Sequence, residues 1–329
     1  MDLKSIKEYL GDDWKRVEAK ISELLRSDID ILNSTNARII AHSGKQLRPL
    51  LSILIARACS GGNVTEASIS YAAAAELLHN ATLLHDDVAD NSDQRRGVPT
   101  IKSLMGPSVS VLVGDFWLVK AMEGILSSGT ALDNRVIRIF SKTLSDLAEG
   151  EMLQLQKAGT CDTGESDYNR IIFNKTASLF EAAAVSAAIS VNAPEEVEKA
   201  VRTYAVSLGM AFQIRDDIFD YSPSSSQVGK PVGVDILEQK ITLPLLGAMM
   251  NVSPAEADAV RGKVREIHSI PSYRDEIIEF VRKNGGIEYA TRKLGEYIRD
   301  AVDSLSVIED CKDKDYLAEV AYYVGNRLS

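Results

Sequence analysis

Hydrophobic positions recur along most of the chain at the spacing of an α-helix. Apolar residues fall at i, i+3, i+4 and i+7 over seven long segments. These segments are Leu47–Cys59, Ser68–Asp90, Ser108–Ser127, Val136–Lys157, Asp167–Val191, Pro194–Tyr221 and Leu237–Met250. The alternation that marks strands is nearly absent, and alanine runs at 72–75 and 182–184 favour helix. The pattern therefore predicts an all-α protein.

The breaks between these segments are short. They are Ser60–Asn63, Asn91–Pro107, Gly159–Ser166, Ser222–Gly233 and Asn284–Gly286. None is long enough or biased enough in composition to be an interdomain linker, and no internal repeat is present. We expect residues 1–329 to form a single domain with more helices than a simple four-helix bundle.

Composition and charge narrow the class of function. The chain has 329 residues, 45% of them hydrophobic, and 37 basic against 47 acidic side chains give a net charge of −10. An acidic chain of this kind argues against a nucleic-acid partner, because such sites present a basic face. Its three cysteines, Cys59, Cys161 and Cys311, form no CxxC pair. We therefore expect no disulfide framework and no zinc site, and a cytoplasmic location.

No segment has the pattern of a membrane span. The longest apolar stretches are Tyr71–Leu84 and Leu179–Val191, which are interrupted by Glu76 and Glu181. Each is shorter than the ~20 residues that a membrane-spanning helix needs. We expect no integral membrane segment.

Two clusters of carboxylates follow directly on apolar helices. They are Asp86-Asp87-Val88-Ala89-Asp90 and Asp216-Asp217-Ile218-Phe219-Asp220. In each cluster the first and last carboxylates stand one helical turn apart on one face, which destabilises a helix unless something neutralises them. One such cluster alone would be typical of a solvated helix end. Because the pattern recurs, it favours a pair of clusters that bind Mg²⁺, which takes few carboxylates and completes its shell with water and phosphate.

A di-iron site is the competing reading. Glu76 and His79 have the Glu-x-x-His spacing of di-iron helix bundles, but such sites need a second pair. None of His42, His85 and His268 follows a glutamate at that spacing. We therefore reject the di-iron interpretation.

Basic residues and glycines follow the carboxylates or open neighbouring helices. The segments are Gly44-Lys45-Gln46-Leu47-Arg48-Pro49, Gln94-Arg95-Arg96-Gly97, Gly229-Lys230-Pro231-Val232-Gly233-Val234-Asp235 and Lys240-Ile241-Thr242-Leu243-Pro244. Taken singly, each is typical of a solvated loop. Together with paired aspartates they indicate an anion site, in which Arg and Lys bind phosphate oxygens and glycine lets the backbone approach.

At these residues the sequence resembles the trans-isoprenyl diphosphate synthase (polyprenyl synthetase) family. Further matching motifs are Ser110–Asp115, Glu149–Gln154 and Lys175–Phe180, so the resemblance covers nearly the whole chain. The stretch His79–Asp87 is most similar to that of the long-chain, octaprenyl-type members. The resemblance implies an all-α fold around a deep central cavity, a prenyltransferase activity and a homodimer.

The resemblance also implies roles for individual residues of the allylic site. Asp86 and Asp90 would hold two Mg²⁺ ions and Asp216 a third, with Asp87, Asp217 and Asp220 supporting them through water. The residues expected to bind the allylic diphosphate are Arg95, Lys175, Lys230 and Lys240. Gln213 and the backbone near Lys175 and Thr176 would face the developing cation.

Isopentenyl diphosphate would bind Lys45, Arg48, His79 and Arg96. Three residues depart from the family pattern. Gln46 stands where many relatives have Arg, and Val234 and Gln239 replace an Asp and a Gly of the second motif region. None of these changes removes a residue that the chemistry needs.

The implied reaction ionises an allylic diphosphate, which the π bond of isopentenyl diphosphate then attacks. Neutralising the leaving diphosphate is the main catalytic requirement, and the carbocation needs a dry pocket. The Ser- and Gly-rich segment Ser222–Gly233 is expected to act as a lid that brings in Lys230.

Product length is expected to depend on the helix before Asp86. Ala75, Leu78, Ala81 and Thr82 are the candidate chain-length residues. Short-chain relatives carry bulky aromatics four or five positions before the first aspartate, where this chain has Thr82 and Ala81. The resemblance therefore implies about eight isoprene units, although small residues at these positions also suit close helix packing.

Other functions remain open at this point. They are a shorter-chain geranylgeranyl- or farnesyl-type synthase, a terpene cyclase, a non-catalytic partner subunit of a prenyl synthase and a non-enzymatic phosphate or metal binder. A terpene cyclase would not need a second diphosphate site, and a silent subunit would show damage to one aspartate cluster, whereas both are whole. A long product would also be compatible with a transient membrane contact during release.

Overall fold

Helices form nearly all the regular structure of residues 3–130, 132–221 and 232–326, the part of the chain that the computed structural model describes. The predicted all-α class is confirmed, because one two-stranded ribbon is the only sheet among these residues. The helices form two compact units. That the chain forms one functional domain stays a prediction.

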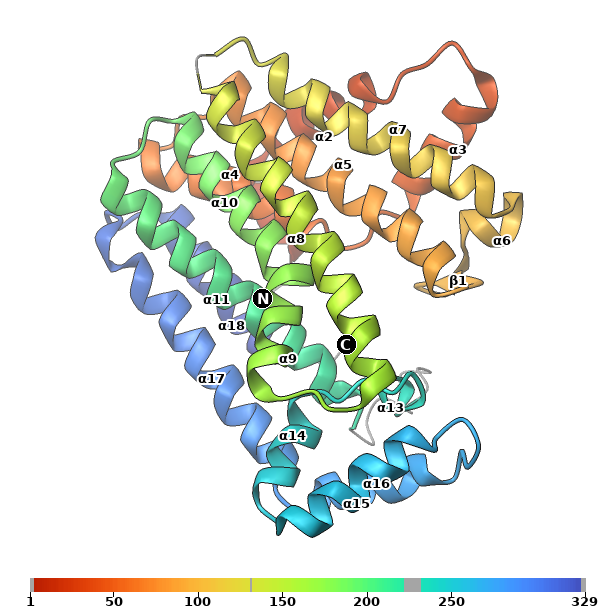
Figure 1. Ribbon diagram of the computed structural model, residues 1–329. Helices are drawn as coiled ribbons and strands as arrows, with labels where there is room; N and C mark the ends of the chain where they lie inside the picture. The colour runs from red at the N-terminus through yellow and green to blue at the C-terminus, as the bar shows by residue number, and fades with distance from the viewer. Residues whose placement is uncertain (1–2, 131, 222–231, 327–329) are drawn as a thin grey trace. The chain divides into compact units, whose positions relative to one another are not determined.

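The first unit comprises residues 1–141, 182–201 and 307–317. Its elements are α1 Leu3–Leu10, α2 Asp12–Leu24, α3 Asp30–Ala41, α4 Leu47–Ser60, α5 Glu66–Ala89, β1 Gln94–Arg95, β2 Val98–Pro99, α6 Ile101–Met105 and α7 Pro107–Leu126. α5 packs against α2, α4 and α7 (Figure 1). The alanines of α5 make this close packing possible, because a small side chain lets neighbouring helices approach.

The second unit comprises residues 142–181, 202–306 and 318–329. Its elements are α9 Glu165–Ile172, a π-helical segment Phe173–Ala177, α13 Val234–Leu237, α14 Leu243–Met250, α15 Pro254–Arg265, α16 Tyr273–Lys283 and α17 Gly286–Ser304. α14 packs against α15, α16 and α17. The elements that contribute residues to both units are α8 Asp133–Thr160, α10 Ser178–Ser190, α11 Glu195–Phe219, the 3₁₀-helix Leu305–Val307 and α18 Lys312–Asn326.

α5 shows how the sequence begins a helix and where it ends one. Thr65 precedes the helix, and its hydroxyl oxygen accepts a hydrogen bond from the Ser68 amide at 3.1 Å. The Thr65 amide in turn donates to Ser68 Oγ at 3.2 Å, which completes a capping box. The helix ends at Ala89, inside the first aspartate cluster. The carboxylates therefore lie on the last turn, where they gain nothing from the helix dipole.

Two predicted helices differ from the observed ones. Leu237–Met250 was predicted as one helix, but Gln239 has a left-handed φ of 58° and α14 begins only at Leu243, with Pro244 in its first turn. Pro244 cannot extend a helix backwards because it clashes with the preceding turn. The predicted helix Asp167–Val191 is divided by the π-helical segment into α9 and α10.

The predicted breaks at Ser60–Asn63 and Asn284–Gly286 are confirmed by the end of α4 and by the boundary between α16 and α17. The break Asn91–Pro107 contains more structure than expected, namely the β1–β2 ribbon and α6. Most of Ser222–Gly233, the expected lid, and Lys230 within it lie outside the described residues.

Close approach at a glycine shapes the π-helical segment. A Cβ atom on Gly209 of α11 would lie 2.5 Å from the Cα atom of Ala177. Replacing Gly209 with Ala should therefore lower the free energy of unfolding by about 1–3 kcal/mol, because backbone atoms cannot move aside cheaply.

The matched control is Gly262→Ala in α15, where a Cβ atom meets nothing within 4 Å. This change should raise the free energy of unfolding by about 0.5–1 kcal/mol, since alanine is the better helix former. Chemical denaturation measures both changes. Equal effects of the two substitutions would contradict the packing argument.

Candidate functional site

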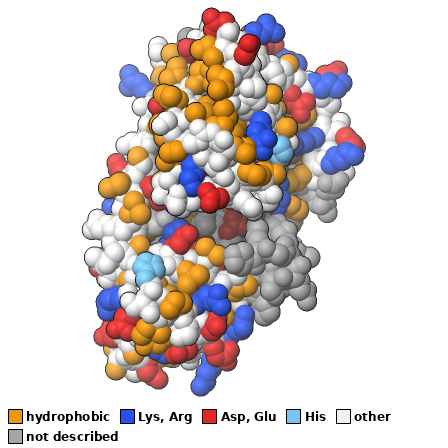
Figure 2. Space-filling model, turned by 90° about the vertical axis from the view of Figure 1, so that its right-hand side faces the viewer, with side chains coloured by type: hydrophobic (Ala, Val, Ile, Leu, Met, Phe, Trp, Pro, Cys, Tyr) orange, Lys and Arg blue, Asp and Glu red, His pale blue; other side chains and the backbone are white. Residues whose placement is uncertain are grey.

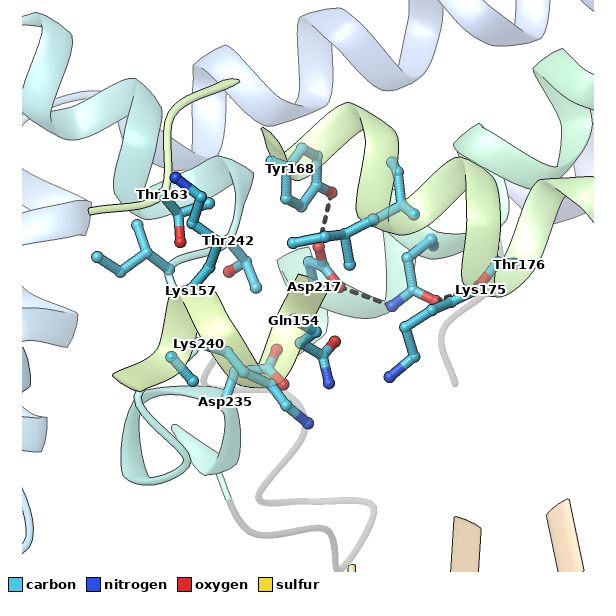
Figure 3. Close-up of a pocket in the computed structure, with 15 residues that line it drawn as sticks. Gln154, Lys157, Thr163, Tyr168, Lys175, Thr176, Asp217, Asp235, Lys240 and Thr242 are labelled. Atoms are coloured by element: carbon cyan, nitrogen blue, oxygen red, sulfur yellow. Dashed lines mark hydrogen bonds between the residues drawn. The ribbon is translucent and has the colours of Figure 1, made fainter. Parts of the chain in front are cut away.

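The second unit contains a pocket lined by several of the predicted residues. Its volume is about 650 Å³, including the part that is open to solvent. The polar residues that line it are Gln154, Lys157, Thr163, Tyr168, Lys175, Thr176, Gln213, Asp217, Asp235, Lys240 and Thr242. Figure 3 shows the ammonium groups of Lys175 and Lys240 extending toward the side of the pocket where Gln154 lies. Cations and carboxylates thus share one concave surface, as an anion site that works through metal requires.

The π-helical segment presents Lys175 and Thr176 to this pocket. Gly150 of α8 makes the approach possible, because a Cβ atom there would lie 2.7 Å from the Cβ atom of Asn174. The ammonium of Lys175 forms an ion pair with Glu151 at 2.5 Å. A π-helical segment of this kind (a π-bulge) inserts one extra residue into an α-helix and redirects the side chains that follow. Such segments often occur at functional sites.

A chain of hydrogen bonds connects the pocket wall to the second aspartate cluster. Tyr168 donates to Asp217 Oδ2 at 2.6 Å, and Gln213 Nε2 donates to Asp217 Oδ1 at 2.9 Å. Thr176 Oγ1 donates to Gln213 Oε1 at 2.9 Å, so the amide of Gln213 is held at both ends (Figure 3). The structure therefore brings Thr176, Gln213 and Asp217 together, and their roles in one site stay a prediction.

Asp217 is held in an unusual electrostatic state. Its side chain is buried, and burial raises the pKa of its carboxyl, against the hydrogen bonds from Tyr168 and Gln213. Neighbouring Asp216 raises that pKa further. Burial likewise raises the pKa of Asp235 well above its ordinary value, with Asp217 as a further cause. Lys240 opposes this shift at Asp235 without cancelling it, so a cation or a proton would stabilise both carboxyls further.

The first aspartate cluster lies in the other unit and repeats part of this arrangement. Asp87 is buried, and Arg95 donates to its Oδ1 at 2.7 Å. Asp86 is only partly buried and Asp90 is exposed. In both clusters the middle aspartate is committed to a protein donor, whereas the first is partly open to solvent. The first aspartates are thus the ones best placed to bind a ligand.

The residues predicted for isopentenyl diphosphate gather in the first unit. Arg48 is 9% exposed, and burial lowers its pKa to about 10, with the carboxylate of Glu76 opposing that shift. Arg96 lies against Gly44, whose φ of 69° favours glycine, and a Cβ atom there would lie 2.2 Å from Arg96 Nη1 and displace the guanidinium. Lys45 is exposed beside them. The guanidinium charges outnumber the one buried glutamate, which favours an anionic ligand.

His79 lies in the same group, and its surroundings favour the uncharged form of its imidazole. Burial lowers its pKa well below the ordinary value, and the positive charges of Arg48 and Arg96 lower it further. A neutral imidazole can donate one hydrogen bond and accept another. His79 can therefore bind a phosphate oxygen as a neutral donor.

The candidate chain-length residues lie along α5. Ala75, Leu78 and Ala81 are fully buried, and Thr82 is partly buried. Thr82 Oγ1 donates to the main-chain oxygen of His79 at 2.8 Å. Small buried residues here serve close helix packing, and their role in product length stays a prediction.

Some residues of the site were missed by the sequence reasoning. Tyr168 and Lys157 line the pocket but belong to no quoted motif. A seven-residue spacing from Lys175 would place Tyr168 on the same face of the continuous helix that the sequence predicts, and this is the one signal that could have pointed to it. Lys157 carried no such signal, since its contacts with Asp162 and Asp167 depend on the turn after α8.

Among the described residues, no group of three side chains is arranged as a ready-made metal site, and no helix is long and apolar enough to cross a membrane. The partly open aspartates nevertheless fit a Mg²⁺ ion that takes one or two carboxylates and completes its shell with water and phosphate.

Comparison with known proteins decides the family. A profile of the polyprenyl synthetase family matches residues 29–279. The chain belongs to the polyprenyl synthetase family. It is 37% identical over 327 residues to octaprenyl diphosphate synthase from Escherichia coli K12, covering 99% of both chains. It is therefore a long-chain trans-prenyltransferase.

Solved structures of the family have the same fold. A decaprenyl diphosphate synthase from Rhodobacter capsulatus superposes with a TM-score of 0.90 at 33% identity, over 98% of each chain. A polyprenyl synthase from Caulobacter crescentus, complexed with calcium and isoprenyl diphosphate, gives 0.88 at 30% identity, over 100% of this chain and 98% of that one. That neighbour combines a divalent cation with a diphosphate ligand.

The buried carboxyls lead to a pH prediction. A carboxyl whose pKa is higher in the folded than in the unfolded chain destabilises the fold once it ionises. Without divalent cations, the free energy of unfolding should therefore fall as the pH rises from about 4 toward neutrality. Asp217→Asn cannot ionise and should remove part of this fall, on the order of 2 kcal/mol.

Chemical denaturation of the metal-free protein at about pH 5 and about pH 8 measures the effect. Asp303→Asn, at an exposed carboxyl, is the control and should leave the pH dependence unchanged. If the free energy of unfolding of Asp217→Asn falls between these pH values as much as that of the unaltered protein, Asp217 does not have the raised pKa assigned to it.

Proposed function

We propose that this prenyltransferase adds isopentenyl diphosphate units head-to-tail to an allylic diphosphate and makes an all-trans polyprenyl diphosphate of about eight units. The observation that carries the proposal is the shared arrangement of the two aspartate clusters. In each, a buried middle aspartate is bound by protein donors while the first aspartate is partly open. The octaprenyl-type relative supports the product length.

The proposed cofactor is Mg²⁺, with about three ions bound through Asp86, Asp90 and Asp216. Bound Mg²⁺ would neutralise the charge that develops on the leaving diphosphate. Asp87 and Asp217 are proposed to support these residues without binding metal directly. Their hydrogen bonds to Arg95 and to Tyr168 and Gln213 fix the helix ends on which the open carboxylates stand.

The allylic diphosphate is proposed to bind Arg95, Lys175 and Lys240, together with Lys230, which lies outside the described residues. In the described site Lys175 is paired with Glu151, and Lys240 with Glu238. These carboxylates hold the two ammonium groups at the pocket, so that little side-chain freedom is lost when a phosphate binds.

Isopentenyl diphosphate is proposed to bind Lys45, Arg48, Arg96 and the neutral His79. Two guanidinium groups offer paired N–H donors that match phosphate oxygens. Glu76 balances one of these charges inside the fold. The remaining positive charge would attract a second diphosphate. A terpene cyclase, which ionises a single diphosphate, would not need this second site.

The developing carbocation is proposed to face Thr176 and Gln213. Their hydrogen bond fixes the amide oxygen of Gln213 near the second cluster. Ile171, Ile172 and Ile241 line the same pocket and help to exclude water, which would quench the cation.

The decisive experiment incubates the protein with Mg²⁺, isopentenyl diphosphate and a fifteen-carbon allylic diphosphate and sizes the products by chromatography. We expect products of more than four isoprene units, centred on about eight, and diphosphate release that needs both substrates. A control with EDTA should abolish turnover. Release of diphosphate from the allylic substrate alone would favour a cyclase, and products of only fifteen or twenty carbons would contradict the proposed length.

Product length is proposed to be set by the small residues of α5 before Asp86. Ala81→Phe and Thr82→Phe should shift the products to shorter chains by several isoprene units, because an aromatic ring would stop the growing tail near Asp86. Ala81→Ser nearly conserves volume and is the control. Chromatographic sizing is paired with a melting curve, and folded phenylalanine variants that keep the original length would contradict this role.

We also propose a homodimer. Leu112, Val119 and Leu126 of α7 are each about half or more exposed, and they recur every seven residues, which places them on one face of the helix. Figure 2 shows that hydrophobic side chains gather on part of the molecular surface among charged groups. An apolar helix stripe is typical of helix–helix contact between subunits, and an exposed apolar surface would also permit a transient membrane contact during product release.

A further inference from the structure

The two aspartate clusters differ at their last residue. Asp90 directly follows the last residue of α5, and its side chain is exposed. Asp220 directly follows the last residue of α11 and is only partly exposed. By sequence alone Asp220 belongs with the aspartates that support metal, since it occupies the same place in the repeated pattern.

Asp220 is connected to a segment that follows it by more than ten residues. Its Oδ1 accepts a hydrogen bond from the Val234 amide at 2.9 Å, and its Oδ2 accepts one from the Asp235 amide at 3.0 Å. Its main-chain oxygen accepts a third from the Gly233 amide at 2.9 Å. Both carboxylate oxygens are thus bound to the first amides of α13, which have no partner within that helix.

The bound segment carries two residues of the pocket. The amide of Lys240 donates to the main-chain oxygen of Asp235 at 2.8 Å, so the position of Lys240 depends on that of Asp235. Both side chains line the pocket with Asp217. Gly233 is fixed as well, since its φ is 77° and a Cβ atom would lie 2.8 Å from Arg274 Cγ.

We propose that Asp220 is a positioning residue that holds Asp235 and Lys240 at the pocket, and that it does not serve the metal ions. The second cluster then has one carboxylate for ligand binding, one buried partner of Tyr168 and Gln213, and one anchor for α13. This inference rests on the proposed function, because Lys240 matters only if an anionic substrate binds there. A charge-assisted hydrogen bond to an amide is strong enough to order a short segment.

The test measures hydrogen exchange of the amides at 234 and 235 by mass spectrometry or NMR, in the full-length metal-free protein. Asp220→Ala should raise their exchange rates about 10- to 100-fold, and Asp220→Asn, which keeps one oxygen, should raise them less. Asp90→Asn is the matched control and should leave these amides unchanged. Unchanged exchange in both Asp220 variants would overturn the proposal.

A second readout separates anchoring from metal support. The Mg²⁺ concentration for half-maximal turnover should rise about tenfold or more in Asp90→Asn and less than about threefold in Asp220→Asn, whose KM for the allylic diphosphate should rise instead. If Asp220→Asn needs as much Mg²⁺ for half-maximal turnover as Asp90→Asn does, the proposal that Asp220 does not serve the metal ions is wrong. Asp90→Asn could leave the Mg²⁺ concentration for half-maximal turnover unchanged while Asp220→Asn speeds exchange of the amides at 234 and 235. That result would contradict the proposed metal site and support the role of Asp220 in positioning α13.

Discussion

Repulsion among carboxylates is the constraint on which the site depends. The last turn of α5, the last turn of α11 and the residue that follows each helix carry aspartates one turn apart, at the helix end where negative charge is least favourable. Burial makes this worse for Asp217 and Asp235, since it raises their pKa values. A soluble helix would not keep such an arrangement for stability alone. In the proposed function, divalent cations and a diphosphate would neutralise these carboxylates, so the repulsion in the free protein would favour ligand binding.

The repulsion is reduced because the aspartates of each cluster differ in burial and in hydrogen-bond partners. Asp87 and Asp217 are buried and bound by Arg95 and by Tyr168 with Gln213, which fixes the helix ends. Asp86 and Asp216 remain partly open. The two clusters look alike in sequence, yet their neighbours make them unequal. A repeated motif therefore indicates shared chemistry without showing that each position does the same work.

The sequence predicted the fold class and most long helices because they depend on local periodicity. α5, α7 and α11 lie where apolar spacing placed them. The π-helical segment could not be predicted, since it depends on contacts with Gly150 and Gly209 that are far away in sequence. Likewise, motif residues such as Asp217 and Thr176 could be named in advance, whereas the hydrogen bond from Tyr168 to Asp217 and the ion pair of Lys175 with Glu151 arise only when the chain folds.

The claim that the open aspartates bind divalent cations on a diphosphate can be tested by anomalous diffraction. The protein would be crystallised with Mn²⁺ in place of Mg²⁺ and with a non-reactive allylic diphosphate analogue. The account predicts anomalous peaks about 2.1–2.2 Å from carboxylate oxygens of Asp86, Asp90 and Asp216, each peak also touching a phosphate oxygen. Diphosphate bound with no manganese at these three residues, or manganese on Asp87 and Asp217 alone, would contradict it.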